Sequence, residues 1–142
     1  MGVMHMVREI VVGADFSSDS RRAVAYAGEL AKALDARLTV AHVDEKAAFV
    51  PGSDLALAEQ LSDRSNIEAV VAELVDRDVR ARGIVRPGIP GQGLCDLARE
   101  EQADLLVVGT QGRSCLANVI LGSVVERVLR DAPCPVLVVR NP

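Results

Sequence analysis

The sequence predicts an α/β fold in which helices cover both faces of an open, five-stranded parallel sheet. Short runs of Val, Ile and Leu alternate along the chain with longer segments whose apolar residues have helical spacing. Each strand is followed by a helix until a final strand, which is typical of parallel sheets with right-handed crossovers. With 142 residues, 49% of them hydrophobic, the chain is predicted to form one domain over residues 1–142.

The first two strands and the helix between them are predicted in the N-terminal third. Arg8 to Ala14 is short and β-branched, which indicates a buried strand. Residues 15–19 supply the turn and N-cap side chains of a helix, whose apolar spacing ends at about Leu34. A second strand is expected over Arg37 to Val43, and residues 44–54 are expected to form a loop.

The middle of the chain predicts a long helix, a third strand and a second helix. Apolar residues from about Leu55 to Asp76 come close to helical spacing. Val79 to Arg86 alternates small or apolar residues with arginines, which predicts an edge strand whose arginines face water. The turn from Gly88 to Gly91 then leads into a helix near Gln92 to Glu101.

The last two strands enclose a glycine-rich segment and a short helix. Asp104 to Val108 is apolar after its first residue and is predicted to be the fourth strand. A helix is expected over Ser123 to Arg130, followed by the final strand over Val136 to Arg140. Two strands and one helix therefore complete the alternating order.

The glycine-rich segment predicts an anion site. The fourth strand ends on Gly109, Gly112 follows, and Gly122 and Ser123 open the next helix. Glycine lets a backbone approach a ligand, and a helix start offers unpaired N–H groups that suit a polyphosphate. If the first and fourth strands are central neighbours, Asp15 and Gly109 meet where the strand order reverses, and ligands bind at that crevice in such sheets.

These residues resemble the ATP-binding branch of the universal stress protein family. The resemblance covers nearly the whole chain and is carried by Asp15, Val43, Gly88-Ile-Pro90, the Gly109-Thr-Gln-Gly112 and Gly122-Ser123 glycines, and residues 132–139. It implies a Rossmann-like sheet of order 3-2-1-4-5 with ATP at the strand ends. It further implies a homodimer through the last strand, slow or absent nucleotide turnover, and a regulatory role in the stress response or over a partner protein.

The resemblance also implies which residues bind the nucleotide. Asp15 is assigned to the ribose, because a carboxylate beside the phosphates would repel them, and Val43 is assigned to the adenine. Arg113 and Ser114 are assigned to the outer phosphates, with Mg²⁺ or Mn²⁺ carried by the phosphates themselves. The full predicted set comprises Gly13, Ala14, Asp15, Val43, Val108, Gly109, Gly112, Arg113, Ser114, Gly122, Ser123 and Val124.

Several of these residues also have purely structural interpretations. The two glycines Gly109 and Gly112 can be turn residues, and Asp15 can be the leading acidic residue of its helix. Ser123-Val-Val-Glu126 has the pattern of a capping box, in which the Ser123 hydroxyl binds the helix's own amide. His42 is expected to be a structural histidine of the second strand.

Composition excludes several other classes of protein. A formal net charge of −4 and 2% aromatic residues argue against a nucleic-acid partner. No apolar run approaches the ~20 residues of a membrane helix, and the N-terminal residues lack a signal-peptide pattern, so a cytoplasmic protein is expected. Cys95, Cys115 and Cys134 form no Cys-x-x-Cys pair, which predicts free thiols rather than a disulfide framework or a zinc site.

The sequence lacks the residues of fast phosphoryl transfer. There is no Gly-x-x-x-x-Gly-Lys-Ser/Thr pattern, and no catalytic base accompanies the glycines. The expectation is therefore an ATP-binding regulator or stress-response nucleotide sensor. Two alternatives stay open: a slow ATP hydrolase or nucleotide-transfer enzyme, and a dimeric interaction module that needs no nucleotide.

Overall fold

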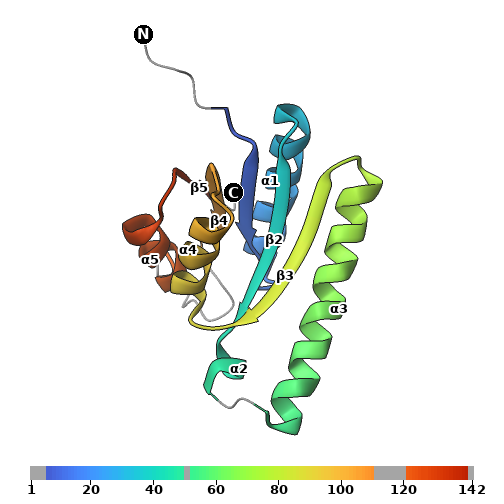
Figure 1. Ribbon diagram of the computed structural model, residues 1–142, viewed down its shortest axis with the longest axis vertical. Helices are drawn as coiled ribbons and strands as arrows, with labels where there is room; N and C mark the ends of the chain where they lie inside the picture. The colour runs from blue at the N-terminus through green and yellow to red at the C-terminus, as the bar shows by residue number, and fades with distance from the viewer. Residues whose placement is uncertain (1–5, 50–51, 111–120, 141–142) are drawn as a thin grey trace.

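The computed structural model describes residues 6–49, 52–110 and 121–140 and places a single parallel sheet between two layers of helices (Figure 1). The sheet has five strands in the order β3-β2-β1-β4-β5, and every neighbouring pair is parallel. This confirms the predicted fold class and strand order. β1 and β4 are central neighbours, so the strand order reverses between them.

The elements occur in the predicted order, with one addition. The strands are β1 (Glu9–Gly13), β2 (Arg37–Asp44), β3 (Arg80–Pro87), β4 (Leu105–Gly109) and β5 (Val136–Val139). The helices are α1 (Ser18–Leu34), α2 (Glu45–Phe49), α3 (Asp54–Asp76), α4 (Pro90–Glu100) and α5 (Ser123–Asp131). The prediction of a loop over residues 44–54 is wrong at α2, which begins where the Asp44 carboxylate accepts a hydrogen bond from the Ala47 amide at 3.2 Å.

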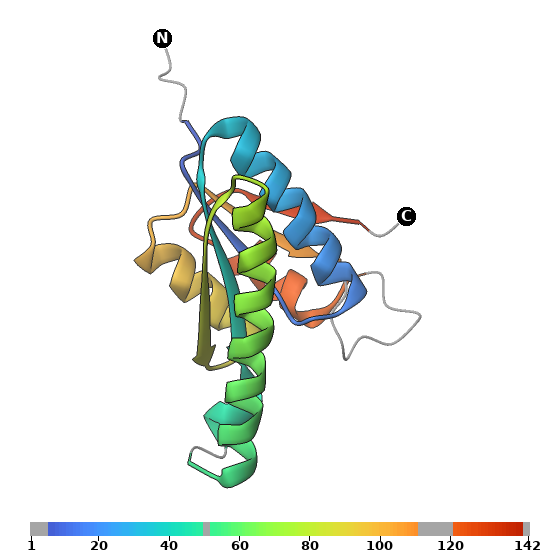
Figure 2. The same ribbon diagram turned by 90° about the vertical axis from the view of Figure 1, so that its right-hand side faces the viewer.

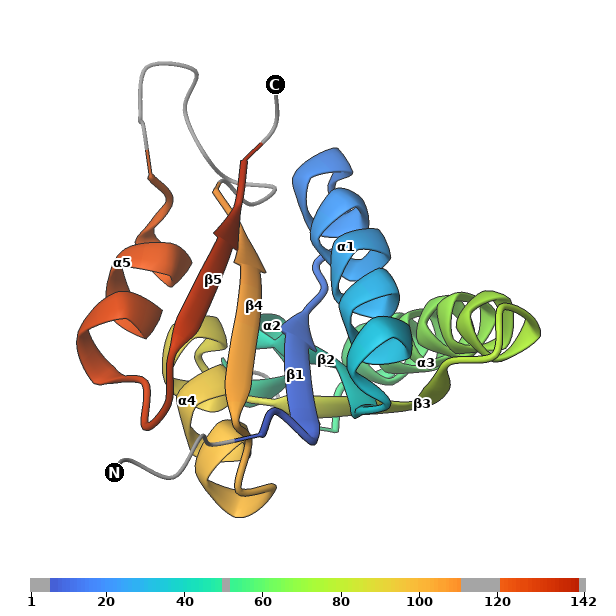
Figure 3. The ribbon, with the colours of Figure 1, turned by 90° about the horizontal axis from the view of Figure 1, so that it is seen from above.

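Both faces of the sheet are buried, as continuous apolar strands require. Figure 3 shows α1 and α3 on one face and α4 and α5 on the other. Ile10, Val12 and Val40 pack under α1 and α3, whereas Val11 and Leu106 pack under α4 and α5. The alternation along β1 therefore divides its side chains between two apolar cores.

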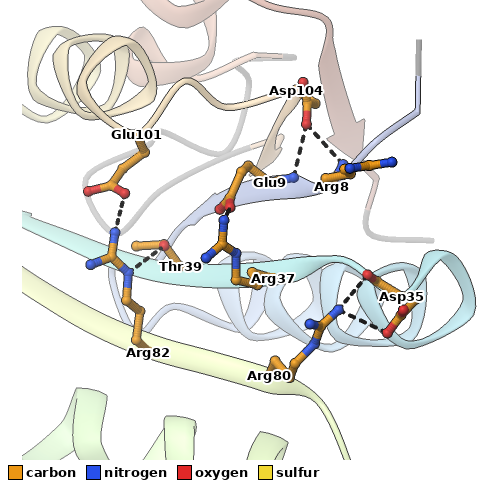
Figure 4. A network of polar contacts seen from close by, with 9 residues as sticks. All are labelled: Arg8, Glu9, Asp35, Arg37, Thr39, Arg80, Arg82, Glu101 and Asp104. Carbon is orange, nitrogen blue, oxygen red and sulfur yellow. Dashed lines mark hydrogen bonds and ion pairs between the residues drawn. The ribbon is translucent and has the colours of Figure 1, made fainter.

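β3 is an edge strand, as predicted, and Arg80 and Arg82 are exposed on it, with side chains that are 59% and 55% accessible. Its arginines are also ion-paired, which the sequence did not show. Arg80 binds Asp35, Arg82 binds Thr39 and Glu101, and Arg86 binds Glu100. Figure 4 shows how Arg80 and Arg82 reach across the sheet, beside the Arg37–Glu9 pair and the contacts of Asp104 with the backbone of Arg8 and Glu9. Charged side chains thus cover this edge of the sheet.

One half of α3 extends beyond the end of the sheet. Figure 2 shows this N-terminal half running alongside α2, past the ends of the strands. Its leucines Leu55 and Leu61 are 73% and 70% exposed, whereas Ile67 and Leu74 in the other half are buried. The projecting half therefore adds a wall beyond the strand ends.

None of the helices in the described ranges is long and apolar enough to cross a membrane.

Candidate functional site

A cavity of about 770 Å³ opens at the carboxyl ends of the strands. Its lining includes every predicted site residue that belongs to the described part of the chain: Gly13, Ala14, Asp15, Val43, Val108, Gly109, Gly122, Ser123 and Val124. The predicted residues Gly112, Arg113 and Ser114 lie outside the described residues. Residues from four separate segments are thus brought together at the point where the strand order reverses.

Asp15 forms the wall of the cavity at the end of β1 and also organises the start of α1. Its carboxylate accepts hydrogen bonds from the backbone N–H of Ser17, at 2.9 Å, and from the Ser17 hydroxyl. The Asp15 amide donates to the Ser20 hydroxyl at 3.2 Å. The structural role of an acidic residue leading the helix is therefore present, and it coexists with a position on the cavity wall.

β2 continues past the end of β1 and presents backbone groups to the cavity. The β1–β2 pairing stops at Gly13 and Ala41, whereas the β2–β3 pairing runs on to Asp44. Ala41 accepts from the Ala14 amide on the β1 side, and Asp44 accepts from the Gly88 amide on the β3 side. Because these directions alternate along a strand, the N–H and C=O of Val43 point to the β1 side, beyond the last β1 partner.

The Val43 side chain fixes this strand end against α4. A Cβ atom on Gly93 would lie 2.7 Å from Val43 Cγ1, and one on Gly88 would lie 3.3 Å from the same atom. The two glycines therefore leave the space that the isopropyl group fills, and Val43 is 6% exposed. Close packing on one side of the strand holds its backbone groups in position on the cavity side.

Gly109 has a packing role that the sequence did not reveal. It is the last residue of β4, where it pairs with Val139, so its interpretation as a turn residue is wrong. A Cβ atom at this position would lie 2.9 Å from the carbonyl oxygen of Asp19. The missing side chain thus lets the end of β4 approach the first turn of α1, where Asp19 accepts a hydrogen bond from the Thr110 hydroxyl at 3.0 Å.

The start of α5 offers backbone amides, although not all of those expected. The helix begins at Ser123 with Gly122 as its N-cap, and no side chain caps it, so the capping-box interpretation is wrong. The Gly122 amide donates to the Thr110 carbonyl at 2.9 Å and is occupied by the protein itself. Ser123 and Val124 are the first helical residues, whose amides have no acceptor inside a helix. Ser123 is also exposed on the cavity wall.

The wall formed by α2 and α3 was missed from the sequence. It adds Glu45 and Lys46 from α2, and Glu59, Ser62, Asp63 and Asn66 from the projecting half of α3. Lys46 Nζ lies 3.3 Å from a Glu59 carboxylate oxygen. With Asp15 and Asp44 nearby in the lining, this end of the cavity carries mostly acidic groups. A ligand's anionic part is therefore disfavoured here.

His42 has the structural role expected of it, but it lies in the cavity wall. Its Nδ1 atom lies 2.7 Å from the Ala14 carbonyl oxygen, and its Nε2 atom lies 3.1 Å from Asp63 Oδ2 on α3. Its ring also packs on Phe16, with centroids 4.9 Å apart. His42 thus joins the end of β1 to the helix that walls the cavity.

The cysteines and acidic residues of the described segments form neither a reactive thiol site nor a metal site. Burial raises the pKa of the Cys95 thiol and of the Cys134 thiol, so both are poor nucleophiles at neutral pH. Both are free thiols, as predicted, and Cys115 lies outside the described residues. In residues 6–49, 52–110 and 121–140, no group of three or more His, Cys, Asp or Glu side chains could hold a metal ion.

Comparisons with known proteins agree with this architecture. The sequence profile of the Universal stress protein family matches residues 6–140. Universal stress protein Rv1636 of Mycobacterium tuberculosis is 37% identical over 153 residues, which cover 97% of this chain and 99% of the relative.

Two solved structures show the same arrangement of elements. Universal stress protein UspA from Lactobacillus plantarum is 25% identical, with a TM-score of 0.88 over 96% of this chain and 100% of its own. A universal stress protein in complex with cAMP is 34% identical, with a TM-score of 0.68 over 95% of this chain and 98% of its own. The chain therefore belongs to the universal stress protein family.

Proposed function

We propose that the cavity binds an adenine nucleotide, ATP with Mg²⁺ or Mn²⁺, and that the protein is a cytoplasmic stress-response regulator with slow or no ATP hydrolysis. Support comes from the similar universal stress protein that is described in complex with cAMP. The observation that carries the proposal is the overhang of β2, which turns the N–H and C=O of Val43 toward the cavity.

The base would bind at Val43. The Watson–Crick edge of adenine has a ring nitrogen that accepts a hydrogen bond beside an amino group that donates one. One N–H and one C=O on the same side of a strand match this pair, so adenine would take the place of the next β1 residue. Asp15 stands next to this position, at the end of β1, and would accept hydrogen bonds from the ribose hydroxyls.

The phosphates would lie at the start of α5. The amides of Ser123 and Val124 and the positive end of the helix dipole favour an anion there. The acidic wall of α2 and α3 disfavours the opposite orientation. Mg²⁺ is usually held by substrate phosphates together with one or two carboxylates, and Glu126, one turn into α5, is a carboxylate of the cavity at this end.

A homodimer would form through β5. This edge strand, Val136–Val139, consists of apolar residues, and its first three residues are half-buried. An uncharged edge with unpaired backbone groups is a template for another strand. We expect residues 136–140 of two copies to pair, so that a signal read by the cavity passes to an assembly of two chains.

Calorimetric titration of nucleotide-free protein with Mg²⁺-ATP tests the proposal. Ser123→Pro removes one amide donor, and the fold tolerates it because proline suits the first helical position and Gly122 has φ −72° and ψ 163°. Losing a hydrogen bond to a charged group should weaken binding about 10- to 100-fold. The control Ser123→Ala removes the hydroxyl alone, so the difference between the variants measures the amide.

Two results would contradict the proposal. Wild-type protein that binds no ATP at millimolar concentration would refute nucleotide binding itself. Equal affinities of Ser123→Pro and wild type would refute the placement of the phosphates at α5. Steady-state phosphate release separates a regulator from a slow hydrolase, because a regulator should release almost none.

A further inference from the structure

His42 faces a hydrogen-bond acceptor with each of its two ring nitrogens. Nδ1 lies 2.7 Å from the carbonyl oxygen of Ala14, and Nε2 lies 3.1 Å from Oδ2 of Asp63. The two side chains are 11% and 16% exposed, so water does not replace either contact freely. Both partners belong to the wall of the nucleotide cavity.

The chemistry of these atoms requires an extra proton. A carbonyl oxygen accepts hydrogen bonds and never donates them, and an ionised carboxylate does the same. A neutral imidazole carries hydrogen on one nitrogen, which the Ala14 contact uses. The Nε2–Oδ2 contact therefore needs one more proton, which makes the ring an imidazolium that faces a carboxylate.

The charged groups around the pair determine what loss of this proton does. Asp63 and Glu59 face the cavity from α3, Asp15 from the β1–α1 connection, Asp44 from the end of β2, and Glu45 and Lys46 from α2. Without the proton, two lone pairs point at each other across 3.1 Å, and one positive charge is lost among these acidic groups. The tie between α3 and the β1 end would break, and the cavity would become less favourable for an anion.

We propose that nucleotide binding is coupled to the proton held between His42 and Asp63. This coupling rests on the proposed adenine-nucleotide function of the cavity. The protonated pair holds α3 against the strand ends, beside Val43, and adds positive charge to the site. Because the protonated form binds the anionic nucleotide better, affinity falls as pH rises, and by reciprocity the bound nucleotide makes the pair hold its proton more strongly.

The Asp63→Asn variant keeps the contact between α3 and His42 but removes its need for an extra proton. The asparagine amide can donate a hydrogen bond to a neutral Nε2 atom while Nδ1 still donates to Ala14. The variant therefore keeps the tie between α3 and β2 but needs no extra proton. A residue with a purely structural role would show the same pH profile before and after this change.

The test measures ATP affinity from about pH 5.5 to about pH 9 for wild type and Asp63→Asn. Titration of the nucleotide itself is common to both proteins and cancels in their comparison. Wild type should lose about tenfold more affinity than Asp63→Asn across this range. Parallel profiles would overturn the coupling and leave the proposed function standing, whereas absence of ATP binding at every pH would overturn both.

Nitrogen-15 NMR of the histidine rings tests the proton without any nucleotide. The chain has two histidines, so a His5→Gln variant assigns the His42 signals. Over the pH range in which wild type binds ATP most tightly, wild type should show hydrogen on both His42 nitrogens, and Asp63→Asn should show hydrogen on Nδ1 alone. A singly protonated His42 ring whose shifts are the same in both proteins would overturn the inference, whatever ATP binding shows.

Discussion

Gly109→Ala distinguishes two explanations of the glycine that ends β4. If glycine is needed there for a ligand's approach, alanine should reduce binding and leave stability unchanged. The structure instead places the added Cβ atom 2.9 Å from the carbonyl oxygen and 3.0 Å from the carbonyl carbon of Asp19. These are backbone atoms of the first turn of α1, which no rotamer change can move aside.

The cost can be estimated from this geometry. Among the described glycines, positive φ occurs at Gly52 and Gly88, so alanine at position 109 has no backbone strain. Overpacking in a close-packed interior costs about 1–3 kcal/mol. Alanine also restricts the unfolded chain, which offsets about 0.4–1 kcal/mol of this. We expect a net loss of about 1–2 kcal/mol, or a midpoint lower by roughly 3–8 °C.

Chemical denaturation followed by circular dichroism measures this loss, and calorimetry with ATP measures binding on the same variant. The helix start should shift with Asp19, so some loss of affinity should accompany the loss of stability. A free energy of unfolding within about 0.5 kcal/mol of wild type would refute the packing explanation.

Three further predictions follow from particular contacts. Gly93→Ala should weaken ATP binding, because the added Cβ atom would lie 2.7 Å from Val43 Cγ1. It should change stability less than Gly109→Ala, because alanine stabilises a helix by about 1 kcal/mol relative to glycine. Calorimetry and denaturation on one sample check both effects. The hydrogen bond from Arg86 lowers the pKa of Glu100, so this pair contributes stability at neutral pH that is lost as acid protonates Glu100. In denaturation measured at several pH values, Glu100→Gln should therefore lose less stability than wild type as the pH falls. Val138→Lys should give a monomer in light scattering, and an unchanged dimer would contradict pairing through β5.

The order of the elements could be predicted because each strand has its own local signal. β1 and β4 are short, apolar runs bounded by polar or glycine residues, and their neighbours show helical spacing. Five residues, as in α2, are too few to show a period. Several leucines of α3 are exposed, so the spacing of its apolar residues does not show which face of this helix is buried.

The candidate site was predictable where it depends on local chain chemistry and not where it depends on distant contacts. Asp15 and Ser123 follow directly from their places beside a strand end and a helix start. The reason for glycine at position 109 is an atom of Asp19, 90 residues earlier, which no local pattern can show. Likewise, Gly122 and Ser123 are both acceptable N-caps, and the bond from Gly122 to Thr110 decides between them.

The two ends of the cavity differ in charge, and this difference orients a nucleotide before any specific contact forms. At the α5 end, helical amides and the helix dipole attract phosphate. At the α2 and α3 end, Lys46 is paired with Glu59, so the remaining acidic groups repel it. Under the proposed function, an anionic nucleotide would enter with its phosphates toward Ser123 and its base toward Val43, next to His42. The proton proposed between His42 and Asp63 would lie at this acidic end, where its charge would offset part of the repulsion between the acidic wall and an anionic ligand.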